Sequence, residues 1–140
     1  MLKFTVLAII LMTILSCERN TPLINYEPKS SQEQALKNVL LHFQEAVTNK
    51  DSKKVLSLIH EKASIMIGTD LKLLSKTEYA KILPERLSEN SYIALGKPKM
   101  TVSGDKAEIK IYMTRGDNNF LMIFNMKLEN NQWYILSWEY

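Results

Sequence analysis

Three short turn signals divide the C-terminal half of the chain into segments in which apolar and polar residues alternate. The turns are Gly104-Asp105, Gly116-Asp117 and Asn130-Asn131. Glycine, asparagine and aspartate adopt the left-handed backbone that two-residue hairpin turns require. The pattern argues against an all-helical or parallel-sheet fold. It predicts four antiparallel strands, near residues 92–102, 107–115, 119–129 and 132–140.

The turns also predict which residues lie opposite one another, because a two-residue turn sets the pairing of the strands that it joins. The predicted pairs are Met113 with Phe120, Ile111 with Met122, Ile109 with Phe124, Leu128 with Trp133, Met126 with Ile135 and Phe124 with Ser137. Two independent turns thus send apolar residues to the same face. We therefore expect one buried face of the sheet, and this register also places Ser137 and Glu139 on it.

The opposite face of the same strands is also rich in large apolar residues. They are Leu121, Ile123, Leu136, Trp138 and Tyr140. A continuous patch of this size is larger than a soluble monomer usually exposes. We expect it to be an interface, either with a second copy of the chain in a homodimer or with another protein. The alternative is that the tether or the C-terminal edge covers it.

The region before these strands predicts helices. Ser31-Gln-Glu-Gln34 can form a capping box at a helix start. An apolar stripe with helical spacing follows, formed by Leu36, Val39, Leu40, Phe43 and Val47. Asp51 is expected to cap a short second helix that extends to Ile59.

A short strand and a third helix complete the predicted elements. The strand is Ala63–Ile67, and Gly68 ends it. Ser75-Lys-Thr-Glu78 is a second capping box, which opens a helix with Tyr79 on its apolar side. Pro84 is expected to kink or restart that helix. The domain predicted for residues 31–140 is therefore of the α+β class.

The first 16 residues have the pattern of a signal peptide. Lys3 supplies a positive charge, and the apolar run Phe4–Leu15 is too short to span a bilayer comfortably. The run ends at Ile14-Leu15-Ser16-Cys17, which resembles the lipobox of bacterial lipoproteins. The resemblance implies that residues 1–16 are removed and that Cys17, the single cysteine of the chain, is lipidated. The alternative is an ordinary secretory signal followed by a chance cysteine.

Residues 17–30 contain Pro22 and Pro28 and show no helical period, so we expect them to form a flexible tether behind the lipid. The lipobox resemblance implies a protein of the cell envelope that is anchored in a membrane by its lipid. Glu18 stands where an aspartate usually retains Gram-negative lipoproteins in the inner membrane. If the host is Gram-negative, the resemblance therefore implies the outer membrane, with the domain facing the periplasm.

The order of the predicted elements resembles that of the nuclear transport factor 2-like (NTF2-like) superfamily, which includes ketosteroid isomerase and SnoaL-type polyketide cyclases. The segments that carry the resemblance are Phe43–Asp51, Leu56–Ile59, Ala63–Gly68 and Leu128–Ile135. It covers residues 31–140 and implies a cone, in which three N-terminal helices pack on a curved, mainly antiparallel sheet. The fold hosts many unrelated functions, so it implies no single activity.

Ketosteroid isomerase-like members use a tyrosine, an aspartate base and a buried protonated acid. The resemblance places Phe43, Ile67 and Phe124 at these three positions. An aliphatic side chain cannot abstract a proton, and a phenyl ring cannot donate one to an oxyanion. Isomerase chemistry by that route is therefore not expected.

Three other residues could still serve an enzyme. Glu139 lies on the predicted core face next to the chain end, Tyr79 faces the cone from the third helix, and His60 follows the second helix. The sequence spacing places no carboxylate beside His60. A small-molecule enzyme of the isomerase, hydrolase or cyclase type, using Glu139 with Tyr79 or His60, is the alternative function.

The favoured prediction is a non-catalytic domain that binds a small apolar ligand or a protein partner. Methionine is adaptable and polarizable, so a face rich in methionine and phenylalanine suits apolar ligands. The predicted pocket residues are Phe43, Ile67, Met113, Met122, Phe124 and Ser137. The competing explanation is that these side chains only fill the core.

Composition argues against several classes of partner. Two histidines and one cysteine are too few for a convincing transition-metal cluster, and the 4 glycines form no phosphate-binding loop. We therefore expect no metal and no cofactor. The formal net charge is +3, and the lysines are scattered among acidic residues. Binding to nucleic acid is not expected, because that function needs a basic patch.

Overall fold

The computed structural model describes residues 21–68, 70–89 and 92–140, so Cys17 and the predicted signal peptide lie outside the described residues. Within the described ranges a 3-10 helix, η1 (Leu23–Asn25), precedes the α-helices α2 (Ser31–Thr48), α3 (Ser52–Ser57) and α4 (Lys76–Glu89). The strands are β1 (Ile59–Ile67), β2 (Lys72–Ser75), β3 (Ala94–Leu95), β4 (Lys99–Ser103), β5 (Lys106–Arg115), β6 (Asn118–Glu129) and β7 (Gln132–Glu139).

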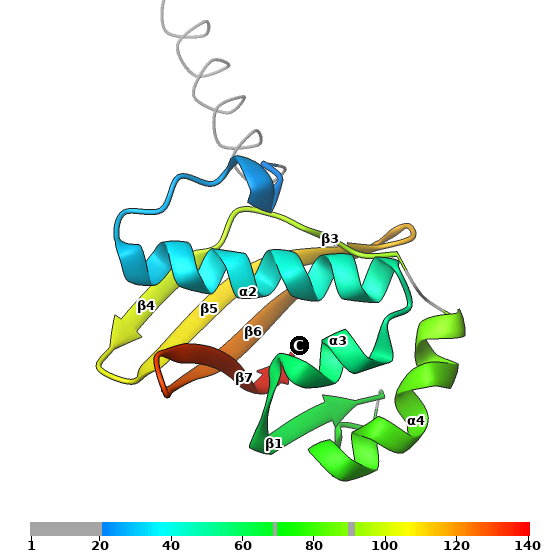
Figure 1. Ribbon diagram of the computed structural model, residues 1–140. Helices are drawn as coiled ribbons and strands as arrows, with labels where there is room; N and C mark the ends of the chain where they lie inside the picture. Colours follow the sequence, from blue (N-terminus) through cyan, green and yellow to red (C-terminus); the bar gives the residue numbers. More distant parts are fainter. Residues whose placement is uncertain (1–20, 69, 90–91) are drawn as a thin grey trace, which may run out of the picture.

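The strands form one curved sheet, and the helices cover one of its faces (Figure 1). The strand order is β2-β1-β7-β6-β5-β3, and β4 pairs with the same strand, β5, as β3 does. The pairing of β1 with β7 is parallel, and all other pairings are antiparallel. α2 crosses the sheet, whereas α4 packs beside β1. The architecture confirms the predicted α+β class, with three helices on a mainly antiparallel sheet.

The hairpin between β5 and β6 has the predicted register along its whole length. Met113 lies opposite Phe120, Ile111 opposite Met122 and Ile109 opposite Phe124. At the next turn Asn130 and Asn131 both have positive φ angles, of 51° and 60°, as a type I′ turn requires. The predicted strand 92–102 is divided into β3 and β4, which lie one after the other along the edge of β5.

The pairing of β6 with β7 follows the predicted register only as far as Ile135. Met126 lies opposite Ile135 as expected, but Phe124 lies opposite Trp138 and not opposite Ser137. A β-bulge inserts Leu136 between the two registers. One extra residue moves every later side chain of the strand to the other face.

The bulge overturns the prediction that Ser137 and Glu139 face the core. Trp138 is buried there, with 7% of its surface exposed. Ser137 accepts a hydrogen bond at 3.0 Å from the Asn125 side-chain amide, on the outer face of the sheet. The physical reason is that burying an indole ring removes a large apolar surface from water, whereas a buried carboxylate would lose its hydration.

The same bulge divides the outward apolar patch predicted for the sheet. Leu121 is 45% exposed, and Ile123 and Leu136 are half-buried. Trp138 lies in the core, and Tyr140 lies at the mouth of a cavity described below. The outward placement of Trp138 and Tyr140 was therefore wrong, and an interface through Leu121, Ile123 and Leu136 stays a prediction.

α2 is capped by Ser30, one residue earlier than predicted. The hydroxyl of Ser30, and not that of Ser31, accepts a hydrogen bond from the Glu33 backbone N–H at 3.1 Å. The Glu33 carboxylate accepts the Lys29 N–H at 2.8 Å and the Tyr26 hydroxyl at 2.7 Å. A carboxylate is a stronger acceptor than the glutamine amide of the predicted box, which favours this position.

The other two predicted caps are confirmed. Asp51 accepts the Lys54 N–H at 2.9 Å. Ser75 accepts the Glu78 N–H at 3.2 Å, and the Glu78 carboxylate accepts the Ser75 N–H at 2.8 Å. These reciprocal bonds start α4, which runs continuously through Pro84.

β1 is longer than the sequence predicted, and β2 was not predicted. Ile59 was assigned to the second helix, but α3 ends at Ser57 and Ile59 already pairs with Ile135 of β7. β2 follows β1 as an edge strand and pairs with it antiparallel. A single buried residue, Leu74, leaves its four positions without a clear alternating pattern.

Residues 21–30, which were predicted to be a flexible tether, pack against α2. Leu23 is 1% exposed. The buried ammonium group of Lys37 in α2 donates hydrogen bonds to the carbonyl oxygens of Ile24, at 2.9 Å, and Tyr26, at 2.6 Å. The folded unit therefore begins before the predicted boundary at residue 31.

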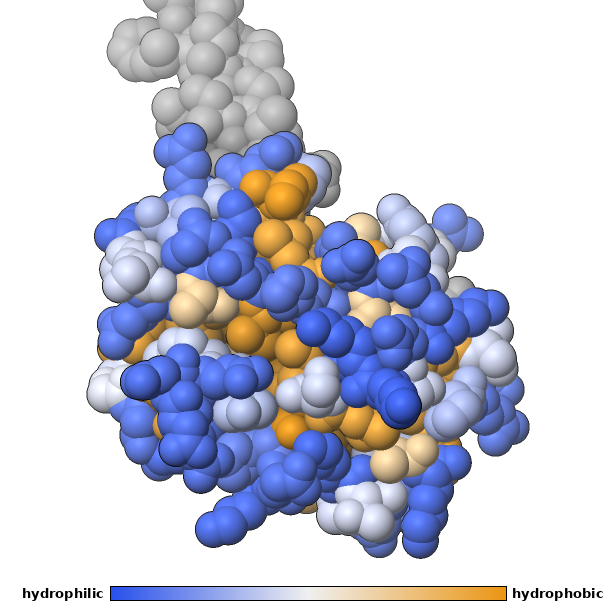
Figure 2. Space-filling model, in the orientation of Figure 1, coloured by the Kyte–Doolittle hydropathy of each residue, from blue (hydrophilic) through white to orange (hydrophobic). Residues whose placement is uncertain are grey.

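The surface over the helices is mostly hydrophilic, and apolar side chains show mainly in the seams between them (Figure 2). No helix among the described residues is both long enough and apolar enough to cross a membrane.

Candidate functional site

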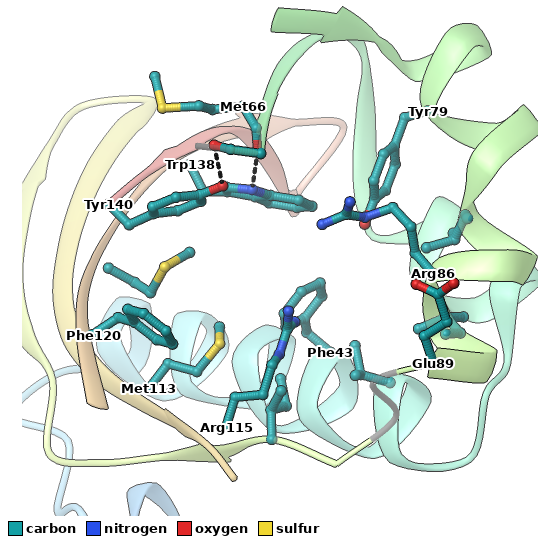
Figure 3. Close-up of a pocket in the computed structure, with 16 residues that line it drawn as sticks. Phe43, Met66, Tyr79, Arg86, Glu89, Met113, Arg115, Phe120, Trp138 and Tyr140 are labelled. Atoms are coloured by element: carbon teal, nitrogen blue, oxygen red, sulfur yellow. Dashed lines mark hydrogen bonds between the residues drawn. The ribbon is translucent and has the colours of Figure 1, made fainter. Parts of the chain in front are cut away.

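A cavity of about 310 Å³ lies between α2, α4 and the ends of β5, β6 and β7 (Figure 3). Its aliphatic and methionine walls are formed by Val47, Leu83, Leu87, Ile93, Met113 and Met122. The alternation of β5 and β6 and the helical spacing of α4 direct these side chains to the same space. The cavity is therefore a product of the core pattern and not of a surface loop.

Aromatic side chains form the rest of the apolar wall, and Trp138 is at their centre. Its ring centroid lies 5.7 Å from that of Phe43 and 5.5 Å from that of Tyr79. The indole N–H donates a hydrogen bond to the Met66 carbonyl oxygen at 2.9 Å. The contact with Tyr79 is edge-to-face and the contact with Phe43 is tilted, and together with that hydrogen bond they hold the Trp138 ring in one orientation.

Tyr140 closes the same side of the cavity. Its hydroxyl donates a hydrogen bond to the Gly68 carbonyl oxygen at 3.0 Å, next to the bond from Trp138 to Met66 (Figure 3). The polar groups of Trp138 and Tyr140 are therefore occupied by the backbone around the end of β1. Both rings present mainly apolar surface to the cavity.

Two arginines, a tyrosine and a glutamate bring polar groups to the cavity. Arg86, Glu89 and Tyr79 come from α4, and Arg115 ends β5. Burial raises the pKa of Tyr79 to about 12, although the positive charges of Arg86 and Arg115 act in the opposite direction. The Tyr79 hydroxyl is therefore protonated at physiological pH and can donate a hydrogen bond.

The predicted pocket residues divide into two groups. Phe43, Met113 and Met122 line the cavity. Phe124 is completely buried in the core, and Ile67 packs against the core. Neither is part of the described cavity wall, and the bulge carries Ser137 to the outer face of the sheet.

The predicted catalytic residues do not come together. Tyr79 lines the cavity, whereas Glu139 is exposed and lies on the outer side of β7. His60 lies elsewhere in the sheet, where its Nε2 atom is 2.7 Å from the Glu129 carboxylate and its Nδ1 atom accepts the Lys62 N–H. Sequence spacing placed no carboxylate beside His60; the tertiary fold supplies one, because β6 brings Glu129 from 69 residues away. Within the described residues, no three histidine, cysteine, aspartate or glutamate side chains form a metal-binding group.

The sequence alone did not single out Arg86, Glu89 and Arg115 as site residues. Arg115 carried a usable signal, because it continues the alternation of Ile109, Ile111 and Met113 on the buried face of β5. A charged residue at a core-facing position is uncommon unless it has a partner or a function. Arg86 had a weaker signal, seven residues after Tyr79 on the same side of α4.

A second hollow, of about 610 Å³, lies between residues 21–33 and the β3–β4 connection. It is larger, but its walls are mainly polar side chains of that surface segment, including Lys29, Glu33 and Lys99. Glu33 is already bonded to Tyr26 and to the Lys29 backbone. The first cavity, between α2, α4 and the sheet, has apolar walls and a few convergent polar groups, and it is called the cone cavity from here on. It is the better candidate for a small-molecule site.

Comparison with known proteins gives similarity in structure alone. No protein-family model matches the chain, and no curated protein matches it. An NTF2-like protein from Cytophaga hutchinsonii has a TM-score of 0.68 at 13% identity, covering 78% of this chain and 96% of that one. A candidate ketosteroid isomerase from Shewanella frigidimarina has a TM-score of 0.65 at 19% identity, covering 75% and 94%.

A third similar structure is a candidate calcium/calmodulin-dependent protein kinase II association domain from Xanthomonas campestris. Its TM-score is 0.70 at 10% identity, covering 86% of this chain and 93% of that one. Identities this low carry the fold and no function. The described residues form three α-helices on a curved, mostly antiparallel sheet, which is the NTF2-like fold.

Proposed function

We propose that the cone cavity binds a small organic molecule with a mainly apolar body and that the domain does not transform it. The observation that carries the proposal is a cavity of about 310 Å³ whose walls are aromatic, methionine and aliphatic side chains. Concave, largely preformed apolar sites with a few polar groups are the usual places where small molecules bind.

An enzyme is the second candidate, because solved structures with this fold include a candidate ketosteroid isomerase and a candidate dehydratase. A general base must reach the proton that it removes. Glu89 has the one carboxylate side chain among the described lining residues, and this side chain is exposed. Phe43, which the family resemblance places at a catalytic position, lines the cavity with a phenyl ring. These features favour binding over catalysis.

A fluorescent apolar probe tests the binding function. N-phenyl-1-naphthylamine is uncharged, and its fluorescence rises in apolar surroundings. We expect saturable binding to the native domain. Phe120→Glu should weaken binding about tenfold or more, because Phe120 lines the cavity and a carboxylate there is poorly compatible with an apolar ligand.

Leu121→Glu is the matched control for that variant. Leu121 is the next residue of the same strand, points to the opposite face and is 45% exposed, against 40% for Phe120. It should leave the probe affinity unchanged. Equal effects of the two variants, or no saturable binding by the native domain, would contradict the proposal. Native mass spectrometry of protein purified from its own host should also show a bound small molecule.

We further propose that Cys17 carries a lipid and holds the domain at a membrane of the cell envelope. The proposal rests on the lipobox-like sequence before Cys17. Labelled palmitate should enter the native protein, and Cys17→Ala should move it from the membrane fraction to the soluble fraction. A Cys17→Ala protein that stays bound to the membrane would refute the lipid anchor.

A further inference from the structure

The Arg115 side chain enters the cavity with an unused hydrogen-bond donor. It extends from the end of β5 toward Phe43 (Figure 3). Its Nε atom is buried and has no hydrogen-bond partner among the described residues. Buried N–H groups without a partner are rare in folded proteins, and each one calls for a physical explanation.

A second guanidinium group reaches the same space from the opposite wall. Arg86 extends from α4 and lines the same cavity as Tyr79 (Figure 3), and its positive charge acts on the Tyr79 hydroxyl. No salt bridge joins Arg86 to another described residue. Both arginines influence the pKa of Tyr79, so all three groups share one electrostatic environment.

Three basic side chains elsewhere in the described domain have partners within the chain. Lys76 lies 2.5 Å from the Glu61 carboxylate, Lys127 pairs with Asp105, and Lys37 binds two carbonyl oxygens. Around the cavity, in contrast, two guanidinium groups face one carboxylate, which belongs to the exposed Glu89. The charged side chains of the described lining therefore sum to one positive charge.

We infer that the ligand of the proposed binding function is an amphipathic monocarboxylate. The carboxylate accepts hydrogen bonds from Arg115 and Arg86, with the Tyr79 hydroxyl as a third donor, and the apolar body lies against Trp138, Met113 and Met122. Arginine is suited to this task because its planar fork matches the two oxygens of a carboxylate. A single negative charge matches the single excess positive charge of the lining side chains.

A matched ligand pair tests the inference. 1-Naphthylacetate and 1-naphthylacetamide have nearly the same shape and differ in charge. Isothermal titration calorimetry at pH 7 and low salt should show the acid binding about 10- to 100-fold more tightly than the amide, the range expected for charge-assisted hydrogen bonds. Added salt should weaken binding of the acid and leave the amide unchanged.

Variants of Arg115 identify the group responsible. Arg115→Met keeps an apolar stem and removes the charge, and it should bring the affinities of acid and amide to within about threefold of each other. Arg115→Lys should restore part of the preference. Lys110→Met removes a positive charge from the exposed face of the same strand and should leave the preference unchanged. This control separates a local contact from an effect of net charge.

The outcomes distinguish this inference from the binding function on which it rests. Equal affinity for acid and amide in the native protein, with the neutral probe still bound in the cavity, would overturn the inference that the ligand carries a carboxylate. The proposal that the cavity binds an apolar molecule would remain intact. A preference for the acid that persists in the Arg115→Met variant and also in the Arg86→Met variant would likewise overturn the inference about the carboxylate. If neither naphthyl compound nor the neutral probe binds, both proposals fail together.

Discussion

Lys37 and Arg115 are two basic residues with buried polar atoms, and they differ in whether the described chain supplies a hydrogen-bond partner for those atoms. The ammonium group of Lys37 lies at 2.6–2.9 Å from two carbonyl oxygens of residues 24 and 26. The Nε atom of Arg115 is buried and has no partner among the described residues. The chain itself supplies the hydrogen-bond acceptors of Lys37. The Nε–H of Arg115, in contrast, remains available to a ligand that enters the cavity.

The difference follows from what each region does in the fold. Lys37 joins the segment around η1 to α2, so replacing it removes hydrogen bonds that hold these two elements together. Arg115 stands at the edge of a cavity, where its charge does not hold two elements together. The comparison predicts effects of opposite sign on stability when the two charges are removed.

The largest expected effect is that of Lys37→Met. Methionine retains the apolar stem but leaves the two carbonyl oxygens without their donor, so the free energy of unfolding should fall by about 2–4 kcal/mol. Urea unfolding followed by circular dichroism measures this. Lys110→Met, at an exposed position, should change stability by less than about 0.5 kcal/mol. A loss for Lys37→Met as small as that of the control would break the comparison.

Tyr26, near Lys37, and Tyr79, near Arg115, predict a smaller loss of stability at alkaline pH. The pKa values of Tyr26 and Tyr79 are both raised to about 12, mainly by burial. Between pH 10 and 12 the unfolded chain releases protons that the folded chain keeps, so stability falls as the pH rises through this window. Two pKa units at Tyr79 correspond to about 2 kcal/mol of lost stability at pH 12.

Tyr79→Phe should remove its part of that decrease, because phenylalanine has no proton to lose. The measurement is the free energy of unfolding in urea at pH 9 and at pH 11.5, for the native chain and the variant. Tyr26→Phe provides the comparison from the Lys37 region, where the Glu33 carboxylate adds to the pKa shift. Identical pH dependence in native and Tyr79→Phe proteins would show that the Tyr79 hydroxyl is not buried as described.

The smallest expected effect is that of Arg115→Met on the ligand-free protein. Removing a buried donor that has no partner should raise the free energy of unfolding by up to about 1 kcal/mol. A thermal unfolding scan with and without 1-naphthylacetate checks this. The variant should lose most of the stabilisation by the ligand that the native protein shows. A large loss of stability without ligand would mean that Arg115 has a structural role like that of Lys37.

The parts of the fold that were predicted correctly depend on signals between near neighbours. The turns at Gly116-Asp117 and Asn130-Asn131 determined the register beside them, and Asp51 and the Ser75–Glu78 box marked helix starts. In each case a few adjacent residues carry the energetic preference. The same reasoning failed for β2, whose short edge pairing depends on a neighbouring strand and not on its own pattern.

The candidate site was harder to predict because one residue changes its composition. An unbroken strand would have put Ser137 and Glu139 into the cone, whereas the bulge at Leu136 puts Trp138 and Tyr140 there. The clue was in the spacing, since Trp133 and Ile135 are in phase with each other but out of phase with Trp138 and Tyr140. The two arginines come from elements far apart in sequence, and only the tertiary fold brings them to one cavity.

The packing of residues 21–30 has a mechanical consequence for a domain held at its N-terminus. A pull on Thr21 would first act on η1, where Leu23 is buried and Lys37 binds the carbonyl oxygens of Ile24 and Tyr26. The load would then pass along α2, and the hydrogen bonds between the strands would bear it last. We expect single-molecule stretching from this end to release η1 before the sheet yields.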